Sequence, residues 1–186
     1  MREYLVLLIG PEKKDKFDNA GAFFLDYFLS HADQIRLTQR ESRVISLGFK
    51  NFSLGKKFGG DNDPEFQKTL ELLKDDFVKK ETDNELYHLD QRKGKVFNHY
   101  FYRLSAKIKD TIKEAGLLWM MYYGADIHMS LYGFEDPSFY KDNRLLGHVV
   151  SHENYVYLNL EEDVARDWER QLGLEFIDTT DFSKSL

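Results

Sequence analysis

The hydrophobic positions in the first thirty residues predict one strand followed by one helix. Residues 4–9 form a continuous apolar run that ends at a Gly-Pro pair, which is typical of a strand buried on both faces. Apolar residues then recur at positions 20, 23, 24, 27 and 28, the spacing of one helix face. Asp18 or Asn19 stands where a side-chain oxygen can cap that helix.

Three more elements are expected before residue 117. The Asp63-Pro64 pair supplies a capping carboxylate and a proline suited to the first helical turn. Residues 50–63 and 81–95 are rich in polar side chains and predict connections. In chain order, the expected elements are a strand over 42–49, a helix from 64 to 77, and a helix over 97–115 that Gly116 ends.

Beyond Gly116 the apolar residues change to strand-like runs. Turn-forming residues at 124–126 and 151–154 interrupt these runs, which predicts two β-hairpins. The expected strands cover 117–123, 127–134, 145–150 and 155–160. A final helix over 161–172 follows, with acidic residues in its first turn and Gly173 as its stop.

Together these elements predict an α+β fold, with a mostly antiparallel sheet of about six strands and about four helices packed against it. We expect the first strand to be central because it is apolar throughout. The length of 186 residues suits a single globular domain over 1–186, with a loose tail from about residue 179.

Strand parity in the second hairpin separates an apolar face from a mixed one. A four-residue loop pairs Val150 with Tyr155 and His148 with Tyr157. The face expected to lie under the helices carries Leu145, Gly147, Val149, Val156, Leu158 and Leu160. The other face carries Leu146, His148, Val150, Tyr155, Tyr157 and Asn159.

The first hairpin shows the same alternation, with His128, Ser130 and Tyr132 on one side. If the two hairpins share a sheet, these three residues join His148 and Tyr157 on one polar-aromatic face. Three interpretations of this face are open. It is a surface half covered by a loop with tyrosine hydroxyls reaching water, a protein-binding surface, or a catalytic site.

The connection between the hairpins adds acidic and aromatic residues. Glu135 and Asp136 stand at its start, and Phe139 and Tyr140 follow. This segment is either a contact loop or a plain turn with its aromatic rings tucked underneath. The candidate partner-binding residues are therefore His128, Ser130, Tyr132, Glu135, Asp136, His148, Tyr157 and Asn159.

Composition and charge remove several function classes. The absence of cysteine excludes disulfides, thiolate metal sites and a cysteine nucleophile. His148 and His152 would stand about 13 Å apart in an extended chain, too far to share one ion, so we expect no metal and no cofactor. The net charge of −6 argues against general binding of nucleic acid or of an anionic membrane, despite the basic residues Arg36, Arg40 and Arg43.

Catalytic signatures are missing or incomplete. No phosphate-binding loop, GxSxG or HExxH motif occurs in the sequence. His128-Met129-Ser130 resembles half of the paired His-x-Ser/Thr signature of the two-histidine phosphoesterases. No other histidine supplies the second half, so we reject that family.

These observations favour a non-catalytic, cytoplasmic module that binds another protein, and the acidic composition predicts a basic partner. Small immunity or antitoxin-type proteins, which neutralise a partner protein, are the class we name by analogy. The alternative is a metal-independent hydrolase with His128 as general base and Ser130, Tyr132 or His148 nearby. The apolar run that ends at Ile9 is far shorter than the roughly 20 residues of a membrane helix.

Overall fold

The structure is a computed structural model, and it describes residues 1–8, 14–39, 60–83, 85–87, 90–91, 96–115, 131, 133–150 and 155–179. The architecture is α+β, as the sequence predicts. The helices in these ranges are α1 (Lys14–His31), α2 (Pro64–Leu73), α3 (Ala106–Ala115) and α4 (Glu162–Leu172). None of them is long and apolar enough to cross a membrane.

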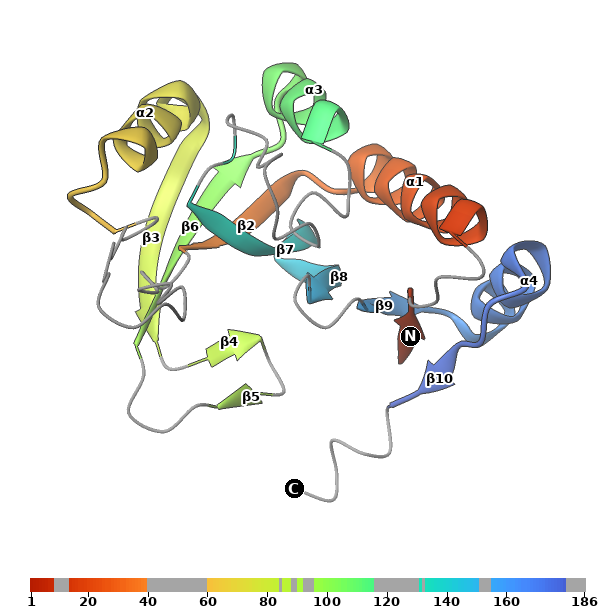
Figure 1. Ribbon diagram of the computed structural model, residues 1–186. Helices are drawn as coiled ribbons and strands as arrows, with labels where there is room; N and C mark the ends of the chain where they lie inside the picture. Colours follow the sequence, from red (N-terminus) through yellow and green to blue (C-terminus); the bar gives the residue numbers. More distant parts are fainter. Residues whose placement is uncertain are drawn as a thin grey trace, which may run out of the picture.

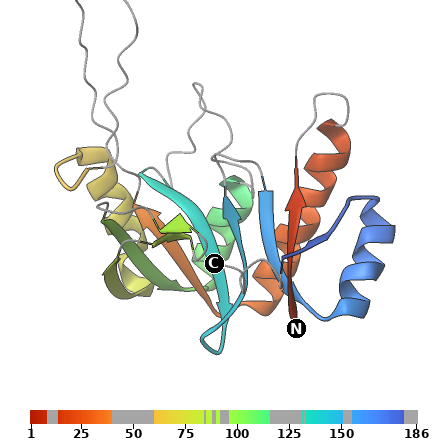
Figure 2. The same ribbon diagram turned by 90° about the horizontal axis from the view of Figure 1, so that it is seen from below.

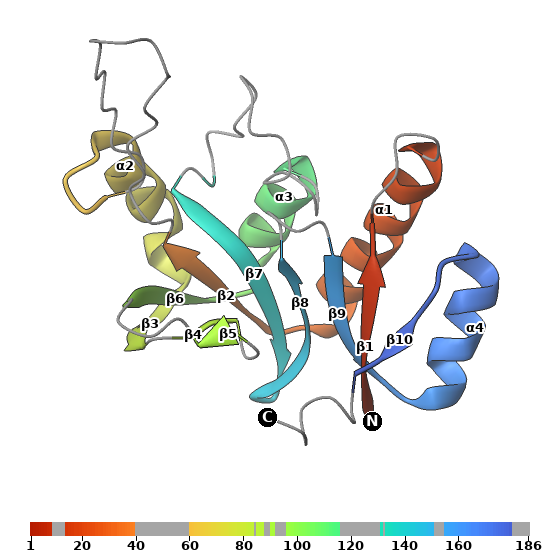
Figure 3. The same cartoon turned by 60° about the horizontal axis from the view of Figure 1, so that its bottom comes forward.

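One antiparallel sheet of eight strands organises the chain, which is more than the six or so expected (Figure 3). In sheet order its strands are β10 (Ile177–Asp178), β1 (Arg2–Leu7), β9 (Tyr155–Leu160), β8 (Arg144–Val150), β7 (Phe134–Lys141), β2 (Gln34–Gln39), β6 (Phe97–Arg103) and β3 (Phe77–Asp83). A separate small sheet joins β4 (Glu85–Tyr87) and β5 (Asp90–Gln91).

The expected central position of the first strand is wrong. β1 lies next to the edge, between β9 and the two-residue strand β10. Its side chains alternate between buried and exposed, and Leu7 is 44% exposed. The apolar run of β1 is therefore fully buried on one face of the sheet and only partly buried on the other.

Helices α1, α2 and α3 cover one side of the main sheet, and the small β4–β5 sheet lies on the opposite side (Figure 1). Helix α4 lies at the β1–β10 end of the sheet. Its Trp168 ring packs against α1, with ring centroids 4.9 Å from Phe23 and 4.8 Å from Tyr27. Aromatic contacts thus fasten α4 to the rest of the core.

A glycine makes room for the tightest aromatic contact of the core. The Phe28 ring of α1 stacks on Phe139 of β7, with centroids 4.4 Å apart. Gly147 lies opposite Phe139 on β8, where a Cβ atom would lie 2.8 Å from the Phe28 ring. The face that carries Gly147 and Val149 is therefore the helix-covered face, as strand parity predicts. Leu146, expected on the other face, also belongs to the main core, where the pairing of β8 with β7 is irregular.

Residues 97–103 form strand β6, and the helix expected over 97–115 is wrong in its first half. Phe97 and Phe101 are four residues apart, which places two side chains on one face of a strand as well as of a helix. The aromatic residues between them favour a strand. The helical stripe continues only in α3, where Ile108 and Ile112 are buried.

Several other boundaries differ from the expected ones. α1 begins at Lys14, so Asp18 and Asn19 lie inside the helix and do not cap it. α2 begins at the expected Asp63-Pro64 pair, where the Asp63 carboxylate accepts a hydrogen bond from the Glu65 N–H. It ends at Leu73, because Phe77 already belongs to β3.

Strands occur in two stretches of the chain where none is expected. β2 adds a strand before the one expected over 42–49, and residues 42–49 lie outside the described residues. β3, β4 and β5 occupy parts of the segment expected to be a connection over 81–95. Thr179 is not loose, because its N–H donates to the carbonyl oxygen of Glu3 at 2.9 Å.

Glu135 and Asp136 lie in strand β7, which corrects the expected acidic loop. β7 joins β8 through a tight turn in which Asp142 and Asn143 have φ values of 49° and 61°. Such left-handed residues suit a two-residue hairpin loop, and short polar side chains tolerate them. The Asp33 carboxylate holds this turn by accepting from the Asp142 N–H at 3.1 Å and from the Lys141 ammonium at 3.2 Å.

Candidate functional site

Cross-strand pairing places four polar or aromatic residues in one row across the sheet. Arg36 of β2 lies opposite Ser138 of β7, Ser138 lies opposite His148 of β8, and His148 lies opposite Tyr157 of β9. Because the adjacent Gly147 faces α1, this row lies on the face turned away from the helices. Figure 2 shows the molecule from that side. The predicted pairing of His148 with Tyr157 is confirmed.

Three of the four residues of this row are buried, which argues against an open binding face. The exposed fractions are 1% for Ser138, 2% for His148 and 7% for Tyr157. The His148 ring stacks on the Tyr157 ring, with centroids 4.5 Å apart. These side chains pack against one another and offer little area to a partner protein.

A second, small apolar cluster explains this burial. Phe97 of β6 packs in one cluster with Val150 of β8 and Tyr157 of β9, and Leu5 and Tyr155 flank it. Two strands, β2 and β7, separate β6 from β8 in the sheet. Contact across that distance requires the sheet to curl, so its helix-free face is concave and partly filled by its own side chains.

Arg36 is the cation within this row. It is half-buried, and its Nη2 donates to the Ser138 hydroxyl at 3.1 Å. Its Nε is buried and makes no hydrogen bond to the described residues. Burial raises the pKa of the neighbouring Tyr140 hydroxyl, and the positive charge of Arg36 works against that rise.

A hydroxyl, an imidazole and a carboxylate form a chain across β2, β6 and β3. His99 is 1% exposed, and its Nε2 lies 3.0 Å from the Asp83 carboxylate. An ionised carboxylate only accepts, so Nε2 carries a proton, and Nδ1 lies 3.0 Å from the Thr38 hydroxyl, from which a neutral imidazole accepts. This order matches a base-activated nucleophile, but Thr38 is 0% exposed and cannot reach a substrate. The chain is suited to holding three strands together.

Amide groups form a second chain on the opposite face of the same strands. Gln39 donates to the Asp61 carboxylate at 2.9 Å and accepts from the Asn98 amide at 2.9 Å. The Thr82 hydroxyl in turn donates to the Asn98 side-chain oxygen at 3.0 Å. Polar side chains of β2, β6 and β3 are thus satisfied by one another.

The remaining candidate residues on strands do not gather into one surface. Asp136 is 1% exposed and has a φ of 50°, at an irregular pairing between β7 and β2. Glu135 is half-buried opposite Thr38. Asn159 is half-buried and donates from its amide to the Leu145 carbonyl oxygen at 3.1 Å.

His128, Ser130, Tyr132 and His152 lie outside the described residues, as do the strand expected over 117–123 and residues 127–130 of the strand expected over 127–134. Of the latter strand, Leu131 and Gly133 are not in strand conformation, and Phe134 begins β7. Within the described ranges, no group of three or more histidine and carboxylate side chains is placed to hold a metal ion. Sequence reasoning considered Arg36 only as a member of a basic stretch, and it missed Ser138, His99 and Asp83. The alternation of polar and apolar residues over 34–38 was the available signal for the strand that carries Arg36.

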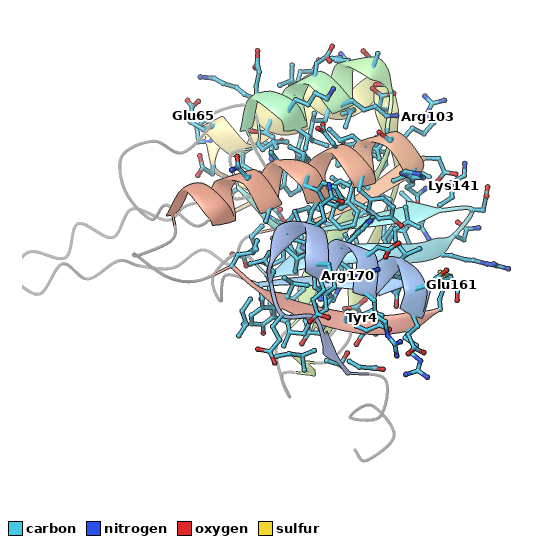
Figure 4. The ribbon with its side chains drawn as sticks, turned by 90° about the vertical axis from the view of Figure 1, so that its right-hand side faces the viewer. Tyr4, Glu65, Arg103, Lys141, Glu161 and Arg170 are labelled. Atoms are coloured by element: carbon cyan, nitrogen blue, oxygen red, sulfur yellow. The ribbon has the colours of Figure 1, made fainter. Side chains whose placement is uncertain are left out.

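A different surface gathers most of the net charge of the protein. Residues 155–179 contain seven acidic and two basic residues, a balance of −5 against −6 for the whole chain. Asp163, Asp167 and Glu175 are exposed there, on or just beyond α4. Figure 4 views the molecule from the side of this helix, with Glu161 and Arg170 labelled. Both basic residues in this range are paired within the helix, Arg166 with Glu162 and Arg170 with Asp167. We call residues 161–179, which comprise α4 and its two flanks, the acidic surface.

The acidic surface is held in place from both sides. Arg2 of β1 reaches the Asp178 carboxylate at 2.9 Å and the Glu162 carboxylate at 3.4 Å. The N-terminal amine lies 3.2 Å from the Glu161 carboxylate. Trp168 packs against α1 on the inner side of α4, so the charged side chains of α4 project from a helix that is held rigidly against the core.

Comparison of the chain with protein-family models, with curated proteins and with solved structures finds no match.

Proposed function

We propose that this chain is a non-catalytic protein-binding module that contacts a basic partner through the acidic surface. The concentration of charge carries the proposal, because residues 155–179 hold a balance of −5, of which Arg2 and the N-terminal amine offset only two charges. Such a field attracts an oppositely charged surface and speeds its association. Exposed acids that form no ion pair among the described residues, such as Glu175, attract the basic partner most strongly.

The burial of chemical groups elsewhere supports a binding role over a catalytic one. The hydroxyl of Thr38 and the rings of His99 and His148 are buried among neighbouring strands. The hydrolase alternative depends on His128, which lies outside the described residues, and no described group adds support to it.

We further propose that the module works as a small immunity or antitoxin-type protein, which binds a basic protein and neutralises it. The net charge of −6 and the length of 186 residues support this class. The class is an analogy of size and charge.

Affinity capture from the native host with matched charge variants tests the proposal. One bait is the natural chain, the second carries Asp167→Lys and Glu175→Lys, and the third carries Asp110→Lys and Glu114→Lys on α3. All four positions are exposed, and both double variants change the net charge equally. We expect mass spectrometry to find a basic protein on the natural and α3 baits and to find it depleted on the α4 bait. The same proteins on all three baits would contradict the proposal.

A further inference from the structure

Among the residues that the structure describes, no strand pairs with the outer edge of β3. β3 pairs with β6 and is the last strand in the sheet order, at the end farthest from α4 (Figure 1). Its first six residues are all exposed. The outward N–H and C=O groups of an edge strand form a template for pairing with another strand.

The lysines of β3 do not shield this edge. The Lys79 ammonium lies 4.5 Å from the centroid of the Phe101 ring, and the Lys80 ammonium lies 5.0 Å from the Tyr100 ring. Both rings belong to β6, so the two side chains fold back over the sheet on its two faces. The usual protection of an edge by outward lysines is therefore weak here.

We propose that a second copy of this chain occupies the edge. The two β3 strands pair antiparallel about a two-fold axis that stands perpendicular to the sheet and passes midway between the two Lys80 residues. The two eight-stranded sheets then become one continuous sheet, and each copy offers the same patch to the other.

Strand length and charge complementarity together favour this register. Centring on Lys80 aligns all seven residues of β3 and places each Lys79 opposite the Glu81 of the other copy, on the same face. Centring on Lys79 aligns only five residues and puts the two Lys79 side chains opposite each other. Centring on Glu81 also aligns only five residues and puts the two Glu81 side chains opposite each other. It pairs Lys79 with the Asp83 of the other copy, but Asp83 already contacts His99. In the preferred register the two Lys80 residues also meet, but each ammonium lies over its own Tyr100 ring.

The irregular part of β3 does not disturb the central pairs. The pairing of β3 with β6 shifts between Phe77 and Lys79, whereas the central pairs involve only Lys79, Lys80 and Glu81. Lys79 and Glu81 already form an ion pair of 2.6 Å within one chain. In the dimer these two residues and their copies form a cluster of four alternating charges.

The same symmetry covers exposed apolar side chains. Leu72, Phe77 and Val78 are 39%, 45% and 44% exposed where α2 passes into β3. A two-fold axis perpendicular to the sheet puts α2 and its copy on the same side of the joined sheet, next to the axis. The acidic surfaces lie at its two far ends, so the dimer would offer two binding sites to a partner.

Reciprocal charge reversal tests the proposal on the full chain. Sedimentation velocity should show a mass twice the 22.0 kDa of one chain. Lys79→Glu alone and Glu81→Lys alone each place like charges opposite each other, so each should raise the dimer dissociation constant about tenfold or more. An equimolar mixture of the two variants should restore the dimer, and so should the double variant Lys79→Glu/Glu81→Lys.

Lys113→Glu and Glu114→Lys, two exposed positions on α3, give the same changes in net charge and should leave the dimer intact. Circular dichroism on each variant checks that it is folded. A chain that stays monomeric, a dimer that both single variants leave unchanged, or a mixture that stays monomeric would overturn the proposal. Partner capture by the acidic surface is measured separately and does not depend on this result.

Discussion

His148 of β8 stacks on Tyr157 of β9, with ring centroids 4.5 Å apart and ring planes inclined by 25°. The two residues are direct cross-strand partners on the helix-free face, and both are buried. Their contact shows that this concave face is packed against itself, as a second small core. Polar and aromatic residues there stabilise the curl of the sheet.

Replacing Tyr157 with alanine should therefore destabilise the protein. The ring fills the small cluster with Phe97 and Val150, so its loss leaves a cavity and should cost about 3 kcal/mol or more of unfolding free energy. Urea unfolding measures this change. Tyr155→Ala, at a half-buried flanking position, should cost less. A Tyr157→Ala variant as stable as the natural chain would show that this face is open after all.

The pairing of His148 with Tyr157 could be predicted from the sequence. A four-residue loop between the two strands sets their register, and the alternation of side chains along each strand then assigns every residue to one face of the sheet. The burial of the pair could not be predicted. It depends on Phe97 reaching across from β6, a strand whose four-residue spacing also fits a helix. Local pattern carries no information on how far a sheet curls.

The start of α2 could also be predicted from the sequence, because Asp63 and Pro64 act on the helix end next to them. The hydrogen-bonded side chains that link β2, β6 and β3 could not be predicted. Thr38, His99 and Asp83 are far apart in sequence, and only the strand order brings them together. The acidic surface was not predicted for another reason. Acidic residues in the first turn of a helix are expected from the helix dipole, so they gave no separate indication of a binding surface.

Removing the Thr38 hydroxyl should leave His99 without a hydrogen bond that it makes in the folded chain. Thr38→Val keeps the shape of the side chain, so the expected loss of about 1–3 kcal/mol reports the buried imidazole nitrogen. Thr82→Val is the control, because Thr82 is exposed and water can replace its hydrogen bond to Asn98. Equal losses of unfolding free energy in the two variants would contradict a buried Thr38–His99 link.

Asp33 should make part of the stability depend on pH. Partial burial alone would raise the pKa of Asp33, but hydrogen bonds from the Asp142 N–H and the Lys141 ammonium outweigh it and hold the pKa below its ordinary value. The stabilisation is therefore complete above the ordinary pKa of 3.8 and is lost as the pH falls through the lower folded pKa.

Unfolding free energies at pH 5 and at pH 2.5 test this sign. The natural chain should lose more stability over that interval than Asp33→Asn, which cannot titrate. Asp26→Asn, at an exposed acid of α1, should follow the natural chain. A larger acid loss in Asp33→Asn than in the natural chain would mean that the pKa of Asp33 is raised.

The affinity of a captured partner for the charge variants tests the central claim most directly. Biolayer interferometry would compare the natural chain, the Asp167→Lys/Glu175→Lys variant and the Asp110→Lys/Glu114→Lys variant at low and at physiological salt. The account predicts that the α4 variant raises the dissociation constant at least about tenfold, most strongly at low salt, while the α3 variant stays close to the natural chain. Equal dissociation constants for the two variants at both salt concentrations would contradict binding through the acidic surface.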